Sequence, residues 1–451
     1  MTMRLIDSLA TTEELTLLFS DQSVLQAMLD FEAALARAEA RCGIIPQSAA
    51  DAIASAAQAT AFDAADLARH TLRAGTPGIP LVKALTERVR ATDPAAAAYV
   101  HWGATSQDVA DTALILLLKK AQALLGADLT RVEQALGRIS DKHADTVMLG
   151  RTLLKAAPPI TLGWKAAAWQ SAVRRGQQQL NRGFAEALLL QFGGATGTLA
   201  ALGDQGLSVA QSLADELGLA NPGTSWHTHR DRLAVLMCAC GVLTGTLGKI
   251  ARDVSLLMQN EVGEAAEAGV LGRGGSSTMP HKRNPIGCAV TLAAANRTPG
   301  LVASFLSGMI QEHERGVGGW HAEWPTVSAL VQAAGVAAAN MAEVMEGLTV
   351  DPEKMRSNID ATRGVIFAER AMILLGRALG RDKAHHLLEE ATRQSVAQGR
   401  RLTEILAATP EVTKHLNQEE IQSLDDPQQY LGAAGALRQR QRAESGNEKK
   451  E

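Results

Sequence analysis

The longest hydrophobic patterns in the chain have the spacing of helices. Apolar side chains recur every three or four residues from Leu114 to Ile139, and again from Leu233 to Leu257. Such spacing over several heptads predicts long helices that pack side by side at shallow angles. Each would be roughly 35–40 Å long at 1.5 Å per residue. Thr228, with Asp231 three residues on, is the expected N-cap of the second helix.

Both helices also carry apolar residues outside these stripes, at Ile115 to Leu117 and at Val235, Met237 and Val242. A helix that is apolar on most sides is buried on most sides. One chain offers too few such helices to cover them all. The pattern therefore predicts that the chain oligomerises through this bundle.

The regions on either side of the bundle differ from it. Near the N-terminus we expect short helices with frequent breaks, including one capped by Asp21 that ends at Arg41. From Asp351 onward the pattern predicts a small helical domain, with one helix ending near Gly380 and the next starting at Asp382. The expected organisation is three helical domains: residues 1–110, a central long-helix bundle at 111–350, and residues 351–451 with a charged tail.

Composition supports the all-α class. Aromatic residues make up only 3% of the chain, while alanine and leucine, which favour helices, are abundant. The net charge of −4 does not suggest a nucleic-acid partner. The basic stretch Leu437–Lys450 is interleaved with Glu and Gln, which indicates a solvated tail rather than a binding arm.

Several features bear on location. The four cysteines form no CxxC pair, and the N-terminus has no basic segment before an apolar run. The most apolar window, Phe184–Leu202, contains Glu186, Gln191 and three glycines, so we do not expect it to span a membrane. We expect a cytoplasmic enzyme.

The segment at 272–285 is the main candidate for chemistry. Three glycines precede Ser276 and Ser277, and a cationic trio, His281 to Arg283, follows. Backbone N–H groups, hydroxyls and a lysine together suit an anionic ligand. The alternative is a flexible surface loop.

This loop resembles a family signature. Five of its residues fit Gly-Ser-x-x-Met-x-x-Lys-x-Asn, the hallmark of the fumarase/aspartase superfamily: Gly275, Ser276, Met279, Lys282 and Asn284. Further segments are similar to family regions in the same order, and together they cover most of the chain: 100–108, 150–158, 191–197 and 379–385.

The resemblance implies a reaction beside a carboxylate. Family members take or give a proton at the carbon next to that carboxylate, through a dianionic aci-carboxylate. It implies that Ser276 is the base, activated by Lys282 and by loop N–H groups. The family also assembles as homotetramers whose sites are shared between three subunits, which agrees with the oligomerisation predicted above.

One residue departs from the common pattern. Most of these lyases read Gly-x-Thr-His in the second region, and Leu153 stands where that proton-carrying histidine would be. This argues against adenylosuccinate and argininosuccinate lyases, fumarase and aspartase. The chain looks more like the bacterial 3-carboxy-cis,cis-muconate cycloisomerases, which lack the histidine and close a lactone in protocatechuate degradation. A 3-sulfomuconate-type cycloisomerase, another superfamily lyase and a non-catalytic helical tetramer stay open as alternatives.

Other side chains could form an anion-binding shell, each with a plainer alternative. His101 could bind a carboxylate, assist protonation or be structural. Thr105 and Ser106 could bind substrate or only cap a helix starting near Asp108. Arg315 could clamp a carboxylate or pair with Glu312 or Glu314. The expected substrate-binding residues are Thr105, Ser106, Arg151, Lys155, Ser277, Asn284 and Arg315, and the expected catalytic residues are Ser276, Lys282 and His101.

No cofactor is expected. The pairs His227/His229 and His385/His386 lack a metal-binding spacing, and the Gly193–Gly197 run follows no clear strand. Glu261 and Glu264 resemble acidic positions that support the family site. The expected partner is a small polycarboxylate, without metal, nucleic acid or membrane.

Overall fold

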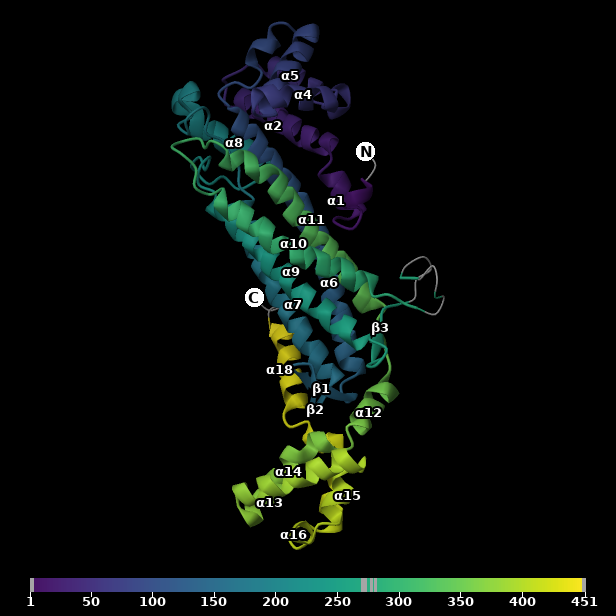
Figure 1. Cartoon of the computed structure of the whole chain (residues 1–451). Coiled ribbons are helices and arrows are strands. Elements are labelled where there is room, and N and C mark those ends of the chain that lie inside the picture. Colours follow the sequence, from purple (N-terminus) through teal and green to yellow (C-terminus); the bar gives the residue numbers. More distant parts are fainter. Residues whose placement is uncertain (1–3, 269–273, 276–278, 280–281, 448–451) are drawn as a thin grey trace. The chain divides into compact units, whose positions relative to one another are not determined.

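The chain is described by a computed structural model that covers residues 4–268, 274–275, 279 and 282–447. Helices dominate it and the strands are short (Figure 1), which confirms the all-α expectation. The described residues group into two compact units. One combines residues 1–129, 176–248 and 290–340, and the other combines 130–175, 249–289 and 341–451. The boundaries expected after residues 110 and 350 stay a prediction.

The first unit begins with a cluster of helices around α2 (Asp21–Arg41), which packs against α3 and α8. Its core contains Phe31, Leu35, Leu81 and Leu213, each at most 1% exposed. The other helices here are α1 (Glu13–Leu18), α3 (Gln47–Ala56), α4 (Ala64–Ala74), α5 (Gly78–Thr92) and α8 (Gly206–Leu217), with 3-10 turns η1 (Leu5–Asp7), η2 (Ala59–Ala61), η3 (Ala96–Tyr99) and η4 (Ala200–Gln205).

Long helices supply the rest of this unit and extend beyond it. They are α6 (Ser106–Lys142), α7 (Leu162–Ala187), α9 (Asp231–Leu257), α10 (Ile286–Ser307) and α11 (Gly319–Glu346). The helices expected at 114–139 and 233–257 are thus both present, in α6 and α9. A glycine allows close packing within the unit, because a Cβ on Gly335 of α11 would clash with a methyl carbon of Leu15.

The apolar residues outside the stripes differ in their exposure to solvent. Ile115, Leu117 and Met237 are at most 2% exposed, so the chain covers them by itself. Val235 and Val242 on α9 are 49% and 55% exposed. Within the described residues, α9 and α11 are long and apolar enough to cross a membrane by composition alone. However, 61% and 67% of those windows are buried inside the fold, as in core helices of a bundle.

The second unit contains two small sheets and the C-terminal helices. Strands β1 (Val147–Thr152) and β2 (Lys155–Thr161) form an antiparallel hairpin, and β3 (Ala265–Ala266) pairs with β4 (Thr349–Val350). Helix α13 packs on α14 around Leu375 and Leu388. The helices are α12 (Pro352–Ala361), α13 (Ala368–Leu379), α14 (Arg381–Gln398), α15 (Leu402–Ala407), α16 (Pro410–Thr413), α17 (Gln418–Ser423) and α18 (Ala434–Asn447), with turns η5 (Val365–Phe367) and η6 (Pro427–Tyr430).

Two expected caps were wrong. Ser20, not Asp21, caps α2, and its hydroxyl accepts the N–H of Ser23 at 3.3 Å. Helix α9 begins at Asp231, and Thr228 instead donates its hydroxyl to the carbonyl of His313 at 3.0 Å. Helix α2 is thus capped one residue earlier than expected, and the Thr228 hydroxyl is used in a contact that spacing along the sequence does not reveal.

The charged C-terminal stretch was also misjudged. It is helical to Asn447, and Arg438 donates to Asp141 at 2.6 Å and to the carbonyl of Ser140 at 3.1 Å. Arg442 pairs with the other oxygen of Asp141. These arginines meet a carboxylate and a carbonyl near the C-terminus of α6, where cations are favoured. The described part of the stretch is therefore docked rather than solvated.

Candidate active site

The turn that leads into α6 holds His101 in an unusual conformation. Its φ is 62°, in the left-handed region that costs a non-glycine residue about 1–2 kcal/mol. The imidazole Nδ1 lies 2.6 Å from Oε1 of Glu32 on α2. The Glu32 side chain is fully buried, and that of His101 is 16% exposed. The histidine is thus fixed from behind by a carboxylate that has no access to solvent.

The surroundings favour the charged form of this histidine. Burial by itself would lower the pKa of His101. The charge of Glu32, its hydrogen bond to the ring and the charge of Asp108 together outweigh burial and raise that pKa. The turn before α6 therefore presents an imidazole whose charged, donating form is favoured by its surroundings.

Asp108 fixes the start of α6. Its carboxylate accepts the N–H of Thr105 at 3.0 Å, and the N–H groups of Gly193 and Gly194 at 3.1 and 2.9 Å. It also lies 2.7 Å from Nε2 of buried His227. The glycine run is thus tied to the helix start through its backbone, and His227 is engaged in the same contact.

Arg315 joins Thr105 and Ser106 at the N-terminus of α6. Its guanidinium donates to the Thr105 hydroxyl and, at 3.3 Å, to the Ser106 hydroxyl. Because the arginine donates, each hydroxyl keeps its own hydrogen for a ligand. Glu312, one of the alternative partners, accepts the N–H of Val317 at 2.8 Å. A guanidinium, two hydroxyls and a helix N-terminus together suit a carboxylate.

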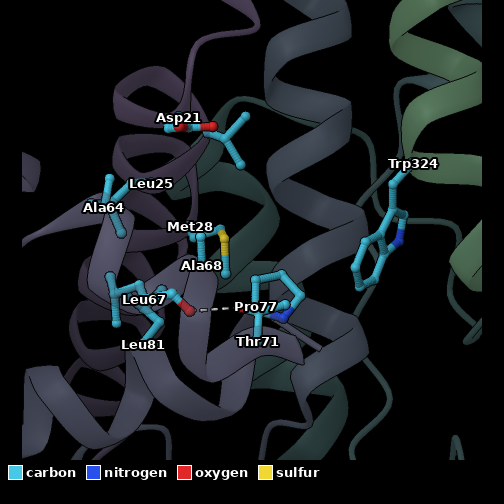
Figure 2. Close-up of a pocket in the computed structure, with 11 residues that line it drawn as sticks. Asp21, Leu25, Met28, Ala64, Leu67, Ala68, Thr71, Pro77, Leu81 and Trp324 are labelled. Atoms are coloured by element: carbon cyan, nitrogen blue, oxygen red, sulfur yellow. Dashed lines mark hydrogen bonds between the residues drawn. The ribbon is translucent and has the colours of Figure 1, made fainter. Parts of the chain in front are cut away.

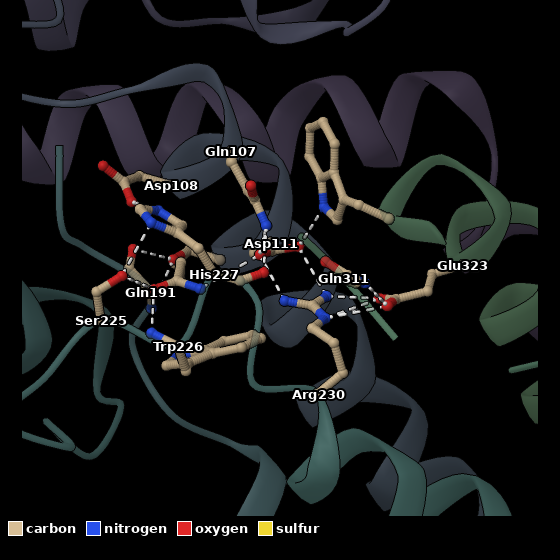
Figure 3. A network of polar contacts seen from close by, with 12 residues as sticks. Gln107, Asp108, Asp111, Gln191, Ser225, Trp226, His227, Arg230, Gln311 and Glu323 are labelled. Atoms are coloured by element: carbon tan, nitrogen blue, oxygen red, sulfur yellow. Dashed lines mark hydrogen bonds and ion pairs between the residues drawn. The ribbon is translucent and has the colours of Figure 1, made fainter. Parts of the chain in front are cut away.

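A buried network lies one turn further along α6 (Figure 3). The fully buried Arg230 donates to Asp111 at 2.8 and 3.1 Å, and to Glu323 at 2.6 to 3.1 Å. Trp320 donates to Asp111 at 2.9 Å, and Gln311 donates to Glu323 at 2.8 Å. The network therefore links α6 and α11 to the segment that carries Arg315.

The two carboxylates in this network differ. Burial alone would raise the pKa of Asp111, but Arg230 and the donors Trp320 and Gln107 more than reverse this and lower it. Burial raises the pKa of Glu323 more than Arg230 lowers it. One arginine thus neutralises Asp111, while Glu323 is biased toward holding a proton.

The signature loop belongs to the second unit. Ser276, Ser277 and His281 lie outside the described residues. At the ends of the loop, Asn284 donates its backbone N–H and its side-chain amide to the carbonyl of Gly274, at 2.9 and 3.2 Å. Lys282 is exposed. The buried Glu267 then accepts the N–H groups of Gly287 and Cys288 at the start of α10. The loop is thus closed at its base.

Arg151 in the same unit has a protein partner. It donates to both oxygens of Glu264, at 2.9 and 2.6 Å, and Asn358 donates to the same carboxylate at 2.8 Å. Glu264 is fully buried. The substrate-binding role predicted for Arg151 stays a prediction, and the structure adds a clear role in orienting β1.

The β1–β2 turn presents Leu153 to solvent. Leu153 and Leu154 form a two-residue turn with φ of 49° and 64°, and they are 97% and 77% exposed. Lys155, the first residue of β2, is exposed as well. At this turn the chain presents a side chain that cannot transfer a proton.

The first unit also contains a cavity of about 240 Å³ with a mostly apolar lining (Figure 2). Its lining includes Met28, Leu67, Leu81 and Trp324, and its one charged residue is Asp21. No predicted site residue lines it. An anionic substrate needs cations and donors, so this apolar cavity does not fit one.

Comparison with known proteins identifies the family. Residues 9–300 match the model described as Lyase, and residues 364–441 match the one described as Adenylosuccinate lyase C-terminus. The chain belongs to the fumarase/aspartase superfamily.

Individual members of the superfamily are similar over nearly the whole chain. A 3-carboxy-cis,cis-muconate cycloisomerase from Bradyrhizobium diazoefficiens is 50% identical, with 92% of each chain covered. The crystal structure of the 3-carboxy-cis,cis-muconate lactonizing enzyme from Pseudomonas putida has a TM-score of 0.93 at 46% identity, over 98% of this chain and 99% of that one. A nitrosuccinate lyase from Streptomyces davaonensis is 43% identical, with 93% and 90% covered.

Sequence reasoning missed Glu32, the residue that contacts His101. Glu32 sits in the buried face of α2, where Leu25, Met28, Glu32, Leu35 and Glu39 follow one another by steps of three and four. A carboxylate at a seam position is rarely buried without a partner. That interruption of the apolar seam was the available signal, and the structure identifies His101 as the partner of Glu32.

Proposed function

We propose that this superfamily member is a 3-carboxy-cis,cis-muconate cycloisomerase. The observation that carries the proposal is Leu153, which stands exposed on the β1–β2 turn where the superfamily lyases have their histidine. An intramolecular addition needs no second proton carrier, because its nucleophile is a substrate carboxylate that is already anionic. Relatives at 43–50% identity that are named 3-carboxy-cis,cis-muconate cycloisomerase support the same reaction.

The reaction can be written with one proton transfer. A carboxylate oxygen of the substrate forms a C–O bond with an alkene carbon, and the π electrons move toward the carbon beside another carboxylate. That carbon takes the proton of the Ser276 hydroxyl, and the serine regains one proton from solvent. Lys282 and the loop N–H groups would stabilise the aci-carboxylate and the alkoxide. The trianionic substrate thus becomes a dianionic lactone with uptake of one proton.

The described side chains would bind the substrate carboxylates. His101, Thr105, Ser106 and Arg315 supply a cation, two hydroxyls and a guanidinium in the first unit. Arg151, Lys155, Ser277 and Asn284 complete the proposed binding set. No metal or other cofactor takes part in this scheme.

A direct assay tests the function. Purified protein with 3-carboxy-cis,cis-muconate should bleach the conjugated diene and take up one proton per turnover. Adenylosuccinate, argininosuccinate and nitrosuccinate serve as comparison substrates for elimination. Turnover of one of these, with an unchanged muconate signal, would overturn the proposal in favour of a lyase, and no turnover of any would favour a structural protein.

Arg315 should matter most for binding. Replacing it with alanine should lower kcat/KM by about ten- to a hundred-fold, mainly through KM, since a hydrogen bond to a charged group contributes about 1.5–3 kcal/mol. Arg315→Lys should recover part of this loss, because lysine restores the positive charge but not the paired N–H donors of the guanidinium. The matched control is Arg69→Ala, an exposed arginine of α4 paired with Asp66. Steady-state kinetics within two-fold of the wild type for Arg315→Ala would remove it from the site.

We also propose a cytoplasmic homotetramer with shared sites. The exposed Val235 and Val242 on α9 support burial against other copies. The four cysteines are unpaired, which suits a reducing compartment. Mass measurement in solution tests the assembly, and charged substitutions at both valines should weaken it.

A further inference from the structure

Two carboxylates share the buried seam of α2 behind His101. Glu32 and Glu39 lie two helical turns apart on the same face, and both side chains are essentially without solvent access. Oε1 of Glu32 meets His101 at 2.6 Å. Neither oxygen of Glu39, nor Oε2 of Glu32, has a hydrogen-bond partner among the described residues. Two buried anions with one cationic partner are unfavourable.

We therefore expect one of the two acids to be protonated and the other to be ionised. Burial, and then the charge of Glu32, raises the pKa of Glu39 to about 9, so Glu39 is a neutral acid at pH 7. Glu32 keeps the single negative charge, opposite the imidazole. Asp108 on α6 adds a second negative charge near the ring, and Arg315 approaches the neighbouring hydroxyls of Thr105 and Ser106.

We propose that Glu32 is a positioning residue for the cycloisomerase site: its buried carboxylate holds His101 as an imidazolium and leaves Nε2 to bind an anionic group of the substrate. Since Nδ1 is occupied by a group without solvent access, Nε2 is the ring nitrogen open to a ligand. The inference rests on the proposed function for its kinetic consequence but not for the state of His101.

The sign of the pH dependence follows from this arrangement. A histidine with a raised pKa is charged at low pH and loses its charge as the pH rises through that value. In the Glu32→Gln variant His101 is still buried but lacks its main negative partner. Its pKa should therefore fall, and the ring should lose its proton at a lower pH. The basic limb of the kcat/KM profile should then move down by about one to three pH units, with a rise in KM and a smaller change in kcat. Glu32→Asp should recover part of the shift.

A measurement without substrate separates this inference from the proposed function. Protein labelled at histidine Cε1 is titrated by NMR, and the His101 signal is assigned by its loss in His101→Gln. Glu32→Gln should shift that titration to lower pH even if the protein proves inactive on muconates. A His101 titration within about 0.3 pH units of the wild type would overturn the proposal.

Two further variants serve as controls. Glu216→Gln removes the pairing of α8 with Arg37 and Arg41 of α2. It should leave both the His101 signal and the pH profile in place, so a shift there would indicate that loosening α2 suffices. Glu39→Gln mimics a neutral acid and should leave the His101 titration unchanged below pH 8. If it shifts that titration as far as Glu32→Gln does, Glu39 carries the negative charge and the assignment to Glu32 is wrong.

Discussion

Ser276→Ala is expected to lower kcat on 3-carboxymuconate by about 10²–10⁴-fold, the usual contribution of a positioned proton-transfer group. The reason is specific to this chain. Position 153 is leucine, so no histidine there can take over the proton transfer to the carbon. Substrate binding should change little, because the cation and hydroxyl groups around Arg315 are untouched. Single-turnover kinetics would separate the chemical step from binding and release.

A serine elsewhere in the same unit provides the control. The hydroxyl of Ser255 donates to the carbonyl of Ala251 within α9, at 2.8 Å. Ser255→Ala should therefore retain activity close to that of the wild type. If Ser276→Ala also stays within ten-fold, another group supplies the proton and the loop serves mainly in binding.

The helices could be predicted wherever the pattern is long and periodic. Apolar spacing predicts the long helices α6 and α9, and the break at Gly380 follows from its freedom to adopt a φ of 80°. The β1–β2 hairpin was not predicted, because its turn uses two leucines at positive φ rather than glycine or asparagine. Docking of α18 depends on Asp141, nearly three hundred residues earlier in the chain, and local spacing carries no such information.

The site was predictable to a similar degree. The motif and the residue types singled out His101, Thr105, Ser106 and Arg315, and the structure places the last three in direct contact. Their roles stay predictions. The groups behind them, Glu32 and Arg230, are charged residues whose partners are distant in the sequence, so their pairing emerges only in three dimensions. A family motif readily indicates candidate substrate-binding residues. It gives less information on the residues that hold those side chains in position.

Arg230→Met is expected to destabilise the protein by about 3–5 kcal/mol, the cost of leaving buried charges without their partner. Two carboxylates, Asp111 and Glu323, would lose their shared cation in a site without solvent. The melting temperature should fall by roughly 3–5 °C, because a chain of this length unfolds with an entropy of about 1 kcal/mol/K. The deficit should shrink toward pH 5. Without the arginine both buried carboxyls have raised pKa values, so stability is present below their unfolded values and is lost as the pH rises.

Two comparisons make this result interpretable. Arg131→Met removes an exposed pair with Glu346, with side chains 42% and 36% exposed, and should cost at most about 1 kcal/mol. If Arg230→Met fails to fold, the triple variant Arg230→Met, Asp111→Asn, Glu323→Gln still decides the question, because it deletes the charges together. Recovery of folding in the triple variant would show that the stability lost in Arg230→Met is electrostatic in origin. A triple variant no more stable than Arg230→Met would instead assign the loss to the packing of the arginine's stem and the hydrogen bonds of its guanidinium.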